Sequence, residues 1–255
     1  MAGLFDGKVE RLERVDSTNT RLKKLAAQGA PEGTVLLAEE QTAGRGTGSR
    51  SFFSPGGEGL YLSVLLRPKA PLAEVLTLTG WVAVAVRDGI EQACGAPCGI
   101  KWLNDIYLNG RKLCGILTEL SLTAEGEADF VVVGIGVNLT QTAETFSAQG
   151  LGGIATSLRA EGYPAEREAL AASVLRELEK MYRQFPCEKE AYLEKYRARC
   201  LTLGRQVCFL QDKEHREGAA VGVDEAFALI VECERKVYTV SSGTVHLMER
   251  GRLHE

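Results

Sequence analysis

Four short segments contain residue types that could bind a ligand or carry out chemistry. The first, Gly44-Arg45-Gly46-Thr47-Gly48-Ser49-Arg50, combines glycines with arginines. Glycines allow close backbone approach, and arginines donate paired hydrogen bonds to phosphate or carboxylate. The segment lacks the final Gly-Lys-Ser/Thr of a P-loop and the spacing of a dinucleotide fingerprint. An anion-binding loop and an ordinary surface loop both fit it.

The second segment is Lys101-Trp102-Leu103-Asn104-Asp105, which follows an apolar stretch. A lysine beside buried residues is costly unless an anionic group meets it. Alternatively, Lys101 extends to water at a strand end while Asn104 and Asp105 form a turn. The segment therefore predicts either an anion site or a simple strand terminus.

The other two segments are ambiguous when each is taken singly. Gly134 and Gly136 interrupt a β-rich run that ends at Asn138, which fits close approach of a ligand or close strand packing. Asp16-Ser17-Thr18-Asn19 has the side chains of a helix cap. Only the combination of all four segments in one chain points to a function.

Stretches with clear secondary-structure patterns must position these segments. Helices are expected at 19–28, 73–93, 165–185 and 188–199. Strands are expected at 8–15, 34–39, 59–66, 100–108, 112–120 and 129–137, with a hairpin turn at Asn109-Gly110. After residue 200, five short alternating segments predict a small β-barrel, so we expect a domain boundary near residues 200–203.

The composition excludes several classes of protein. The chain has 255 residues, of which 45% are hydrophobic and 25% charged, as in a soluble globular protein. Its net charge of −4 is unlike that of a general nucleic-acid binder. Seven cysteines without a C-x-x-C motif indicate neither a disulfide framework nor a zinc site. We expect no signal peptide and no membrane span, and a reducing cytoplasm is the simplest location.

Together and in this order, the motifs VDSTN, QTAGRG, KWLND with GRKLCGILTE, and GIGVN resemble the biotin protein ligase family. The resemblance runs from about Val15 to Asn138, and SSGTV near the C-terminus supports it. It implies an α+β fold, with a mixed sheet, flanking helices and a small C-terminal SH3-like β-barrel. It also implies a catalytic biotin- and ATP-binding domain at 1–200 and an SH3-like domain at 201–255.

Ligases of this family activate biotin with ATP to biotinyl-5'-AMP and then transfer biotin to a lysine of a biotin carboxyl carrier protein or domain. The resemblance implies ATP with Mg²⁺, whose protein ligands stay unknown, and no general base is assigned. The implied biotin-binding residues are Ser17, Thr18, Asn19, Gln41, Gly44, Arg45, Gly46, Lys101, Gly115 and Gly134. The implied nucleotide-binding residues are Arg45, Thr47, Arg50, Phe52, Lys101, Asn104, Gly136 and Asn138. Lys101 and Arg45 are the expected catalytic cations, because a cation offsets the repulsion between carboxylate and phosphate.

The sequence departs from the family pattern at three positions. Thr47 stands where many members have a basic residue, which predicts faster escape of biotinyl-AMP. Phe52 replaces an adenine-covering tryptophan and keeps stacking with a smaller ring. Leu103 replaces the proline of Lys-Trp-Pro-Asn-Asp, which should loosen the backbone slightly.

The resemblance also carries expectations about partners. A first catalytic strand near Lys8 leaves no room for an N-terminal helix-turn-helix, so we expect a monofunctional ligase without direct DNA binding and without a membrane partner. Monomer and homodimer both occur in the family, and carriers such as acetyl-CoA carboxylase, pyruvate carboxylase or a decarboxylase subunit fit equally. The alternatives are a lipoate or octanoate ligase or transferase, a non-catalytic biotin sensor, and an RNA-binding module that the net charge disfavours.

Overall fold

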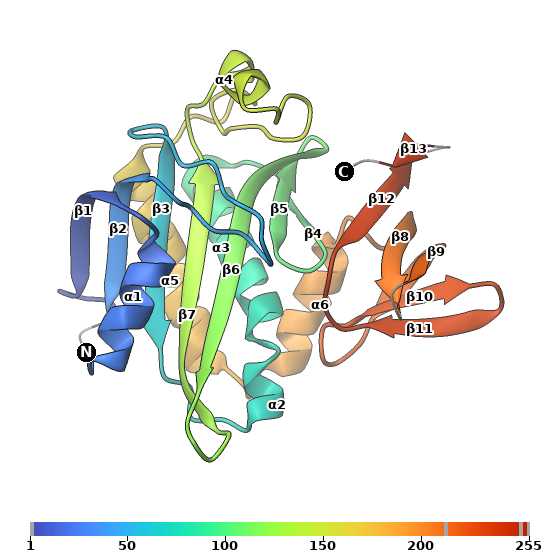
Figure 1. Cartoon of the computed structure of the whole chain (residues 1–255), viewed down its shortest axis with the longest axis horizontal. Helices are drawn as coiled ribbons and strands as arrows, with labels where there is room; N and C mark the ends of the chain where they lie inside the picture. The colour runs from blue at the N-terminus through green and yellow to red at the C-terminus, as the bar shows by residue number, and fades with distance from the viewer. Residues whose placement is uncertain (1–2, 212–213, 250–251, 254–255) are drawn as a thin grey trace.

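The structure is a computed structural model that describes residues 3–211, 214–249 and 252–253. Its main body is a mixed sheet with the strand order β1-β2-β3-β7-β6-β5-β4 (Figure 1). β1 pairs with β2 in parallel, and the other neighbours pair antiparallel. The strands are β1 (Val9–Val15), β2 (Val35–Gln41), β3 (Gly59–Leu66), β4 (Gly99–Lys101), β5 (Asp105–Leu108), β6 (Arg111–Leu122) and β7 (Ala128–Asn138). The mixed sheet expected from the sequence is confirmed.

Helices cover both faces of this sheet, with α1 on one face and α3, α5 and α6 on the other (Figure 1). They are α1 (Thr18–Ala27), α2 (Leu72–Val75), α3 (Leu78–Cys94), α4 (Ala143–Ala148), α5 (Arg167–Gln184) and α6 (Lys189–Arg199). Within the described ranges, none of these helices is long and apolar enough to cross a membrane.

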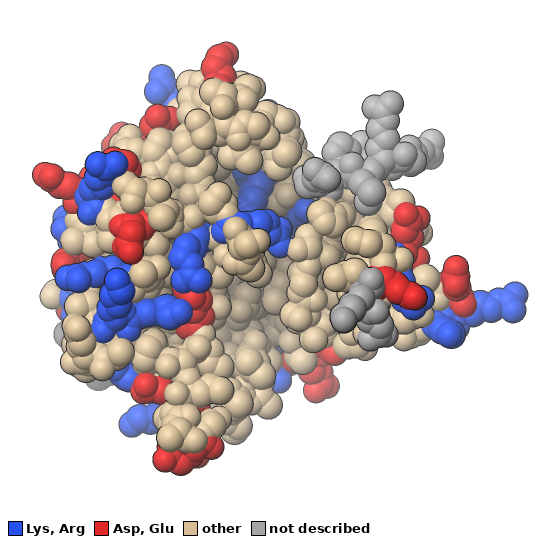
Figure 2. Space-filling view, viewed as in Figure 1, with Lys and Arg blue, Asp and Glu red and all other residues tan. Residues whose placement is uncertain are grey.

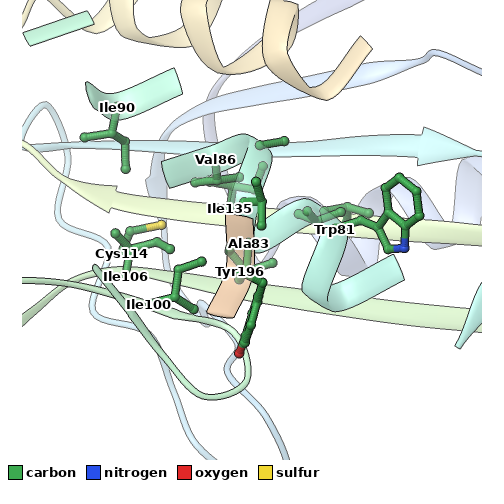
Figure 3. Packing of buried hydrophobic residues seen from close by; sticks show 14 of the residues in the cluster. Trp81, Ala83, Val86, Ile90, Ile100, Ile106, Cys114, Ile135 and Tyr196 are labelled. Atoms are coloured by element: carbon green, nitrogen blue, oxygen red, sulfur yellow. The ribbon is translucent and has the colours of Figure 1, made fainter. Parts of the chain in front are cut away.

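Alternating apolar side chains explain the layers. In β2, Leu36 packs in a small cluster with Leu22 of α1, whereas its neighbours Val35 and Leu37 belong to the large cluster under α3. Figure 3 shows Ile135 of β7 packed in this large cluster with Val86 of α3. Successive strand residues point to opposite faces, so one pattern fills both layers. Because α1 is short, part of its face of the sheet stays open to polar residues.

A second, antiparallel sheet follows α6 and has the order β11-β10-β9-β8-β12-β13. Its strands are β8 (Gln206–Gln211), β9 (Glu214–Val223), β10 (Leu229–Cys233), β11 (Lys236–Val240), β12 (Val245–Glu249) and β13 (Arg252–Leu253). The five expected short strands are confirmed. Closure into a barrel is not seen in the described ranges, because the β10–β11 hairpin projects away from β12 (Figure 1).

Two expected elements are each split by a turn. The helix expected at 73–93 breaks at Thr77, whose Oγ1 donates to the Glu74 carbonyl at 2.7 Å. The strand expected at 100–108 is instead the hairpin of β4 and β5, which places Lys101 opposite Asp105. This second turn decides the geometry of the site.

Candidate active site

Four paired residues in one row across the sheet line a pocket. Gly136 pairs with Gly115, Gly115 with Asp105, and Asp105 with Lys101. Side chains of paired residues lie on the same face of a sheet. The register of the strands therefore brings Gly136 of the GIGVN segment and Lys101 and Asp105 of the KWLND segment together, although the two segments are far apart in the sequence.

The end of the pocket at α1 is a connected network of hydrogen bonds. Ser17 caps the N-terminus of α1. Thr18 donates to Gln41 Oε1 through its backbone N at 2.9 Å and its Oγ1 at 3.0 Å. Ser63 Oγ lies 2.7 Å from Thr18 Oγ1 and 2.6 Å from Asn19 Oδ1. Because each side chain is held by another, this end presents polar atoms in fixed positions.

The glycines that line the pocket make room for side chains. A Cβ at Gly134 would lie 2.2 Å from Asn19 Oδ1, and one at Gly136 would lie 2.5 Å from Cε1 of Phe52. A Cβ at Gly115 would come within 3.2 Å of the same ring. We expect these glycines to give a ligand access to the backbone, but in this structure the Phe52 ring occupies the space above two of them.

The loop that contains the arginines folds over the pocket as a small hairpin. Gly46 N donates to the Arg50 carbonyl at 2.8 Å, and Phe52 N donates to the Gly44 carbonyl at 2.9 Å. Arg50 Nη2 donates to Thr244 Oγ1 at 2.5 Å, just before β12. The loop thus lies between the main sheet and the C-terminal sheet, and both contribute to the pocket.

Cations gather in the middle of the pocket. Lys101 Nζ donates to Tyr107 Oη at 3.3 Å, and Lys112 Nζ lies 2.7 Å from Asp105 Oδ1. Burial lowers the pKa of Lys101; Asp105 opposes this shift, and Lys112 and Arg50 add to it. Burial also raises the pKa of Tyr107 to about 12, so its hydroxyl stays neutral. Figure 2 shows basic side chains around the hollow between the main body and the C-terminal sheet.

The far end of the pocket is largely apolar. Besides Lys101, Asp105 and other polar residues, its lining includes Phe53, Tyr107, Phe146, Leu151, Ile154 and Ala155. Phe52, Lys101 and Lys112 line both this cavity and the polar one, so the two cavities adjoin at these residues. A pocket that is polar at one end, cationic in the middle and apolar at the other fits an extended ligand with an anionic centre.

The structure brings together almost all of the residues expected from the sequence. Every one of them lines the pocket except Gly44, which pairs with Phe52 at the base of the loop, where a Cβ would be 2.4 Å from the Phe52 carbonyl. Asn138 lines the apolar end, and its Nδ2 donates to the Thr156 carbonyl at 2.9 Å.

Lys112 is the main residue that sequence reasoning missed. The Asn109-Gly110 turn is the signal that could have found it, because it folds Lys112 back opposite Tyr107. In the described residues, no group of three or more His, Cys, Asp or Glu is placed to hold a metal ion.

Comparisons with known proteins agree with this geometry. The model of the biotin/lipoate A/B protein ligase family matches residues 12–138. The chain is 36% identical over 235 residues to the bifunctional ligase/repressor BirA of Bacillus subtilis, covering 91% of this chain and 72% of that protein. It is 35% identical over 243 residues to the biotin–[acetyl-CoA-carboxylase] ligase of Mycobacterium tuberculosis, covering 91% and 86%.

A solved structure is similar over nearly the whole chain. It is the biotin protein ligase from Aquifex aeolicus in complex with biotin and ATP, with a TM-score of 0.77 and 30% identity. The match covers 95% of this chain and 99% of that one. The chain belongs to the biotin/lipoate A/B protein ligase family.

Proposed function

We propose that this chain is an ATP-dependent biotin protein ligase, which forms biotinyl-5'-AMP and transfers biotin to a lysine of a biotin carboxyl carrier protein. One observation carries the proposal: a hydrogen-bonded polar cavity and a largely apolar cavity adjoin at the cations Lys101 and Lys112, which line both. Relatives named as biotin ligases, and a similar structure that holds biotin and ATP, support it.

The polar end suits the ureido ring of biotin, and the apolar end suits adenine. Thr18, Asn19 and Gln41 supply fixed donors and acceptors that a fatty acid could not use. Phe53 and Phe146 offer apolar surface to the base. We place Phe52 and Asn138 on the nucleotide side, in keeping with the sequence.

In the first step, an oxygen of the biotin carboxylate attacks the α-phosphorus of ATP, and the bond to pyrophosphate breaks. Cations at the meeting point offset the repulsion between the two anions and stabilise charge on the phosphoryl oxygens. We assign this task to Lys101 and Arg45, as the sequence indicates, and add Lys112. Mg²⁺ reaches such sites bound to nucleotide phosphates, so we treat it as part of the substrate.

In the second step, the amine of the carrier lysine attacks the carbonyl carbon of the mixed anhydride, and AMP leaves. We propose a carrier domain of a biotin-dependent enzyme such as acetyl-CoA carboxylase, which the name of the Mycobacterium tuberculosis relative mentions. Given the net charge of −4, we propose no direct role on DNA. Seven free cysteines favour a reducing compartment such as the cytoplasm.

The test is acid-dependent ATP–pyrophosphate exchange with biotin, lipoate and octanoate compared side by side. We expect exchange with biotin alone, and its loss in Lys101→Ala and Lys112→Ala but not in Lys69→Ala, which removes an exposed lysine. Exchange with lipoate or octanoate instead would assign the protein to the other branch of the family. Biotin binding without any exchange would identify a sensor.

A further inference from the structure

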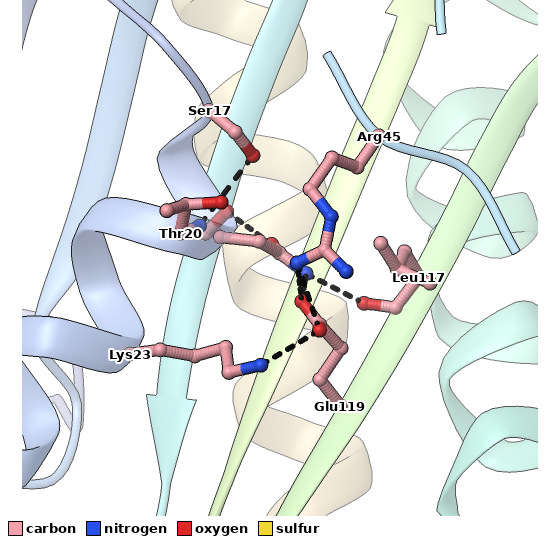
Figure 4. Close-up of polar contacts among 8 residues, drawn as sticks. Ser17, Thr20, Lys23, Arg45, Leu117 and Glu119 are labelled. Carbon is pink, nitrogen blue, oxygen red and sulfur yellow. Dashed lines mark hydrogen bonds and ion pairs between the residues drawn. The ribbon is translucent and has the colours of Figure 1, made fainter. Parts of the chain in front are cut away.

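Glu119 of β6 is not part of the pocket lining, yet it binds a residue of the pocket loop (Figure 4). Arg45 Nη1 lies 3.0 Å from Glu119 Oε1 and 3.2 Å from Oε2. Lys23 Nζ of α1 lies 2.9 Å from Oε1, and Asn19 Nδ2 donates to Oε2 at 3.0 Å. One carboxylate therefore collects two cations and an amide donor.

The position of Glu119 differs from that of the cationic middle of the pocket. Lys112 Cε lies 3.4 Å from the position of a Cβ at Gly115. Glu119 is four residues further along β6, which is about 13 Å at the rise of a strand. A phosphate beside Lys112 and the carboxylate of Glu119 therefore lie at different positions along the strand, so the Arg45 guanidinium that pairs with Glu119 moves along β6 to meet the phosphate.

Arg45 can leave Glu119 without stranding a buried charge. The Glu119 side chain is 14% exposed, and Lys23 and Asn19 still hold it after Arg45 departs. Arg45 is 41% exposed, so its head group reaches water during the move. Breaking a buried pair is costly mainly when one charge is left alone, and this does not happen here.

Glu119 also stays charged at neutral pH. Burial raises the pKa of its carboxyl, but hydrogen bonds from Lys23 and Asn19 and the charges of Lys23 and Arg45 outweigh burial. The pKa is therefore held below its ordinary value. An ionised carboxylate competes with a phosphate for the same guanidinium.

We propose that Glu119 is a positioning residue that holds Arg45 in a resting position and competes for it with the phosphate groups of ATP and biotinyl-AMP. This inference rests on the proposed function, in which Arg45 meets those groups. Lys23 shares Oε1 with Arg45 and so weakens the hold of Glu119 on Arg45. The balance among the three side chains sets part of the affinity for nucleotide.

Two substitutions test the competition because they act in opposite directions. Glu119→Gln removes the charge and keeps an oxygen that accepts from Asn19. We expect the KM for ATP in biotin-dependent exchange and the dissociation rate of biotinyl-AMP each to fall about two- to fivefold, the range for partly exposed ion pairs. Lys23→Gln leaves Arg45 as the one cation paired with Glu119, so both quantities should rise. Glu125→Gln, at an exposed turn, is the matched control.

A purely structural role for Glu119 makes a different prediction. Weaker or unchanged nucleotide binding in Glu119→Gln would overturn the inference, as would a shift of Lys23→Gln in the same direction. In an Arg45→Gln background, Glu119→Gln should have no further effect, and a persistent effect would show that it does not act through Arg45. Thermal unfolding of each variant checks the fold. Absence of biotin-dependent exchange in the wild type would instead refute the proposed function itself.

Discussion

At the scale of single residues, the charge of Lys101 predicts a pH dependence. Burial lowers its pKa, so it loses its proton at a lower pH than an exposed lysine would. Activity that needs the ammonium group then falls as pH rises through that lowered pKa. In the Lys101→Arg variant, the guanidinium at this position does not titrate in this range. We expect the alkaline limb of kcat/KM for biotin-dependent exchange to move to higher pH in this variant, and an unmoved limb would argue against Lys101.

Thr47 supports a second prediction at this scale. Its Oγ1 accepts from Asn104 Nδ2 at 3.4 Å, so it adds a neutral contact where many family members have a cation. Thr47→Arg supplies a charge-assisted donor near the adenylate phosphate. Since such a bond contributes about 1.5–3 kcal/mol, we expect biotinyl-AMP to dissociate at least about tenfold more slowly. Thr47→Gln is the uncharged control, and equal rates in wild type and Thr47→Arg would contradict the idea.

At the scale of elements, Glu161 ties the β5–β6 turn to the segment after α4. Its carboxylate accepts from Asn109 Nδ2 at 2.7 Å, Arg111 Nη2 at 2.6 Å and Thr156 Oγ1 at 2.5 Å. Burial raises the pKa of Glu161, but these donors and the charge of Arg111 outweigh it and lower the pKa. A carboxyl with a lowered folded-state pKa stabilises the fold above its unfolded value of about 4.3, and this contribution is lost as pH falls through the folded value.

The prediction for this element is therefore specific to pH. Glu161→Gln should reduce the free energy of unfolding by about 2 kcal/mol at neutral pH, since it weakens three hydrogen bonds to a charged carboxylate, two of them part-buried. The difference from wild type should shrink as pH falls through the lowered pKa of Glu161, below which both side chains are neutral. Urea unfolding at neutral pH and at a series of acidic pH values measures this, and a constant difference would show that charge is not involved.

Local patterns in the sequence identify most of the elements but not the turns that join them. β3 is confirmed at Gly59–Leu66 because its unbroken apolar run is buried at every position. The sequence left two interpretations of Lys101–Asp105, a strand that continues and a strand end followed by a turn, and the pairing of β4 with β5 decides for the turn. Lys112 was not predicted as a site residue, because its place in the pocket depends on pairing across strands, for which the Asn109-Gly110 turn is the one local signal. The order of the strands likewise follows from long-range contacts that no local pattern contains.

At the scale of the whole molecule, one core joins the two sheets. Phe227, in the turn between β9 and β10 of the C-terminal sheet, packs edge-on against Tyr196 of α6, with 5.2 Å between ring centroids. Its carbonyl accepts from Trp102 Nε1 at 2.8 Å. A single cluster of buried residues includes all three of these residues. We therefore propose that residues 1–200 and 201–255 have different roles but fold together as one unit.

Gly80 of α3 provides the test of this unity. A Cβ there would lie 2.1 Å from Cδ1 of Phe227. Gly80→Ala should lower the free energy of unfolding by about 1–3 kcal/mol through overpacking. Tryptophan fluorescence and circular dichroism should still report one coincident transition. Phe227→Leu should relieve part of the cost in the double variant, and separate transitions for the two sheets would refute a shared core.

The hydrogen bond between Arg50 and Thr244 also has a consequence for biosynthesis. The pocket includes Gly243, Thr244 and Val245, so it is incomplete on a nascent chain that ends at residue 200. At about 5–20 residues per second, the ribosome needs a further two to nine seconds, roughly, to add these residues. During that interval the main sheet can form while the nucleotide side of the pocket stays open, so competence to adenylate biotin should arise late, as one of the last events of synthesis.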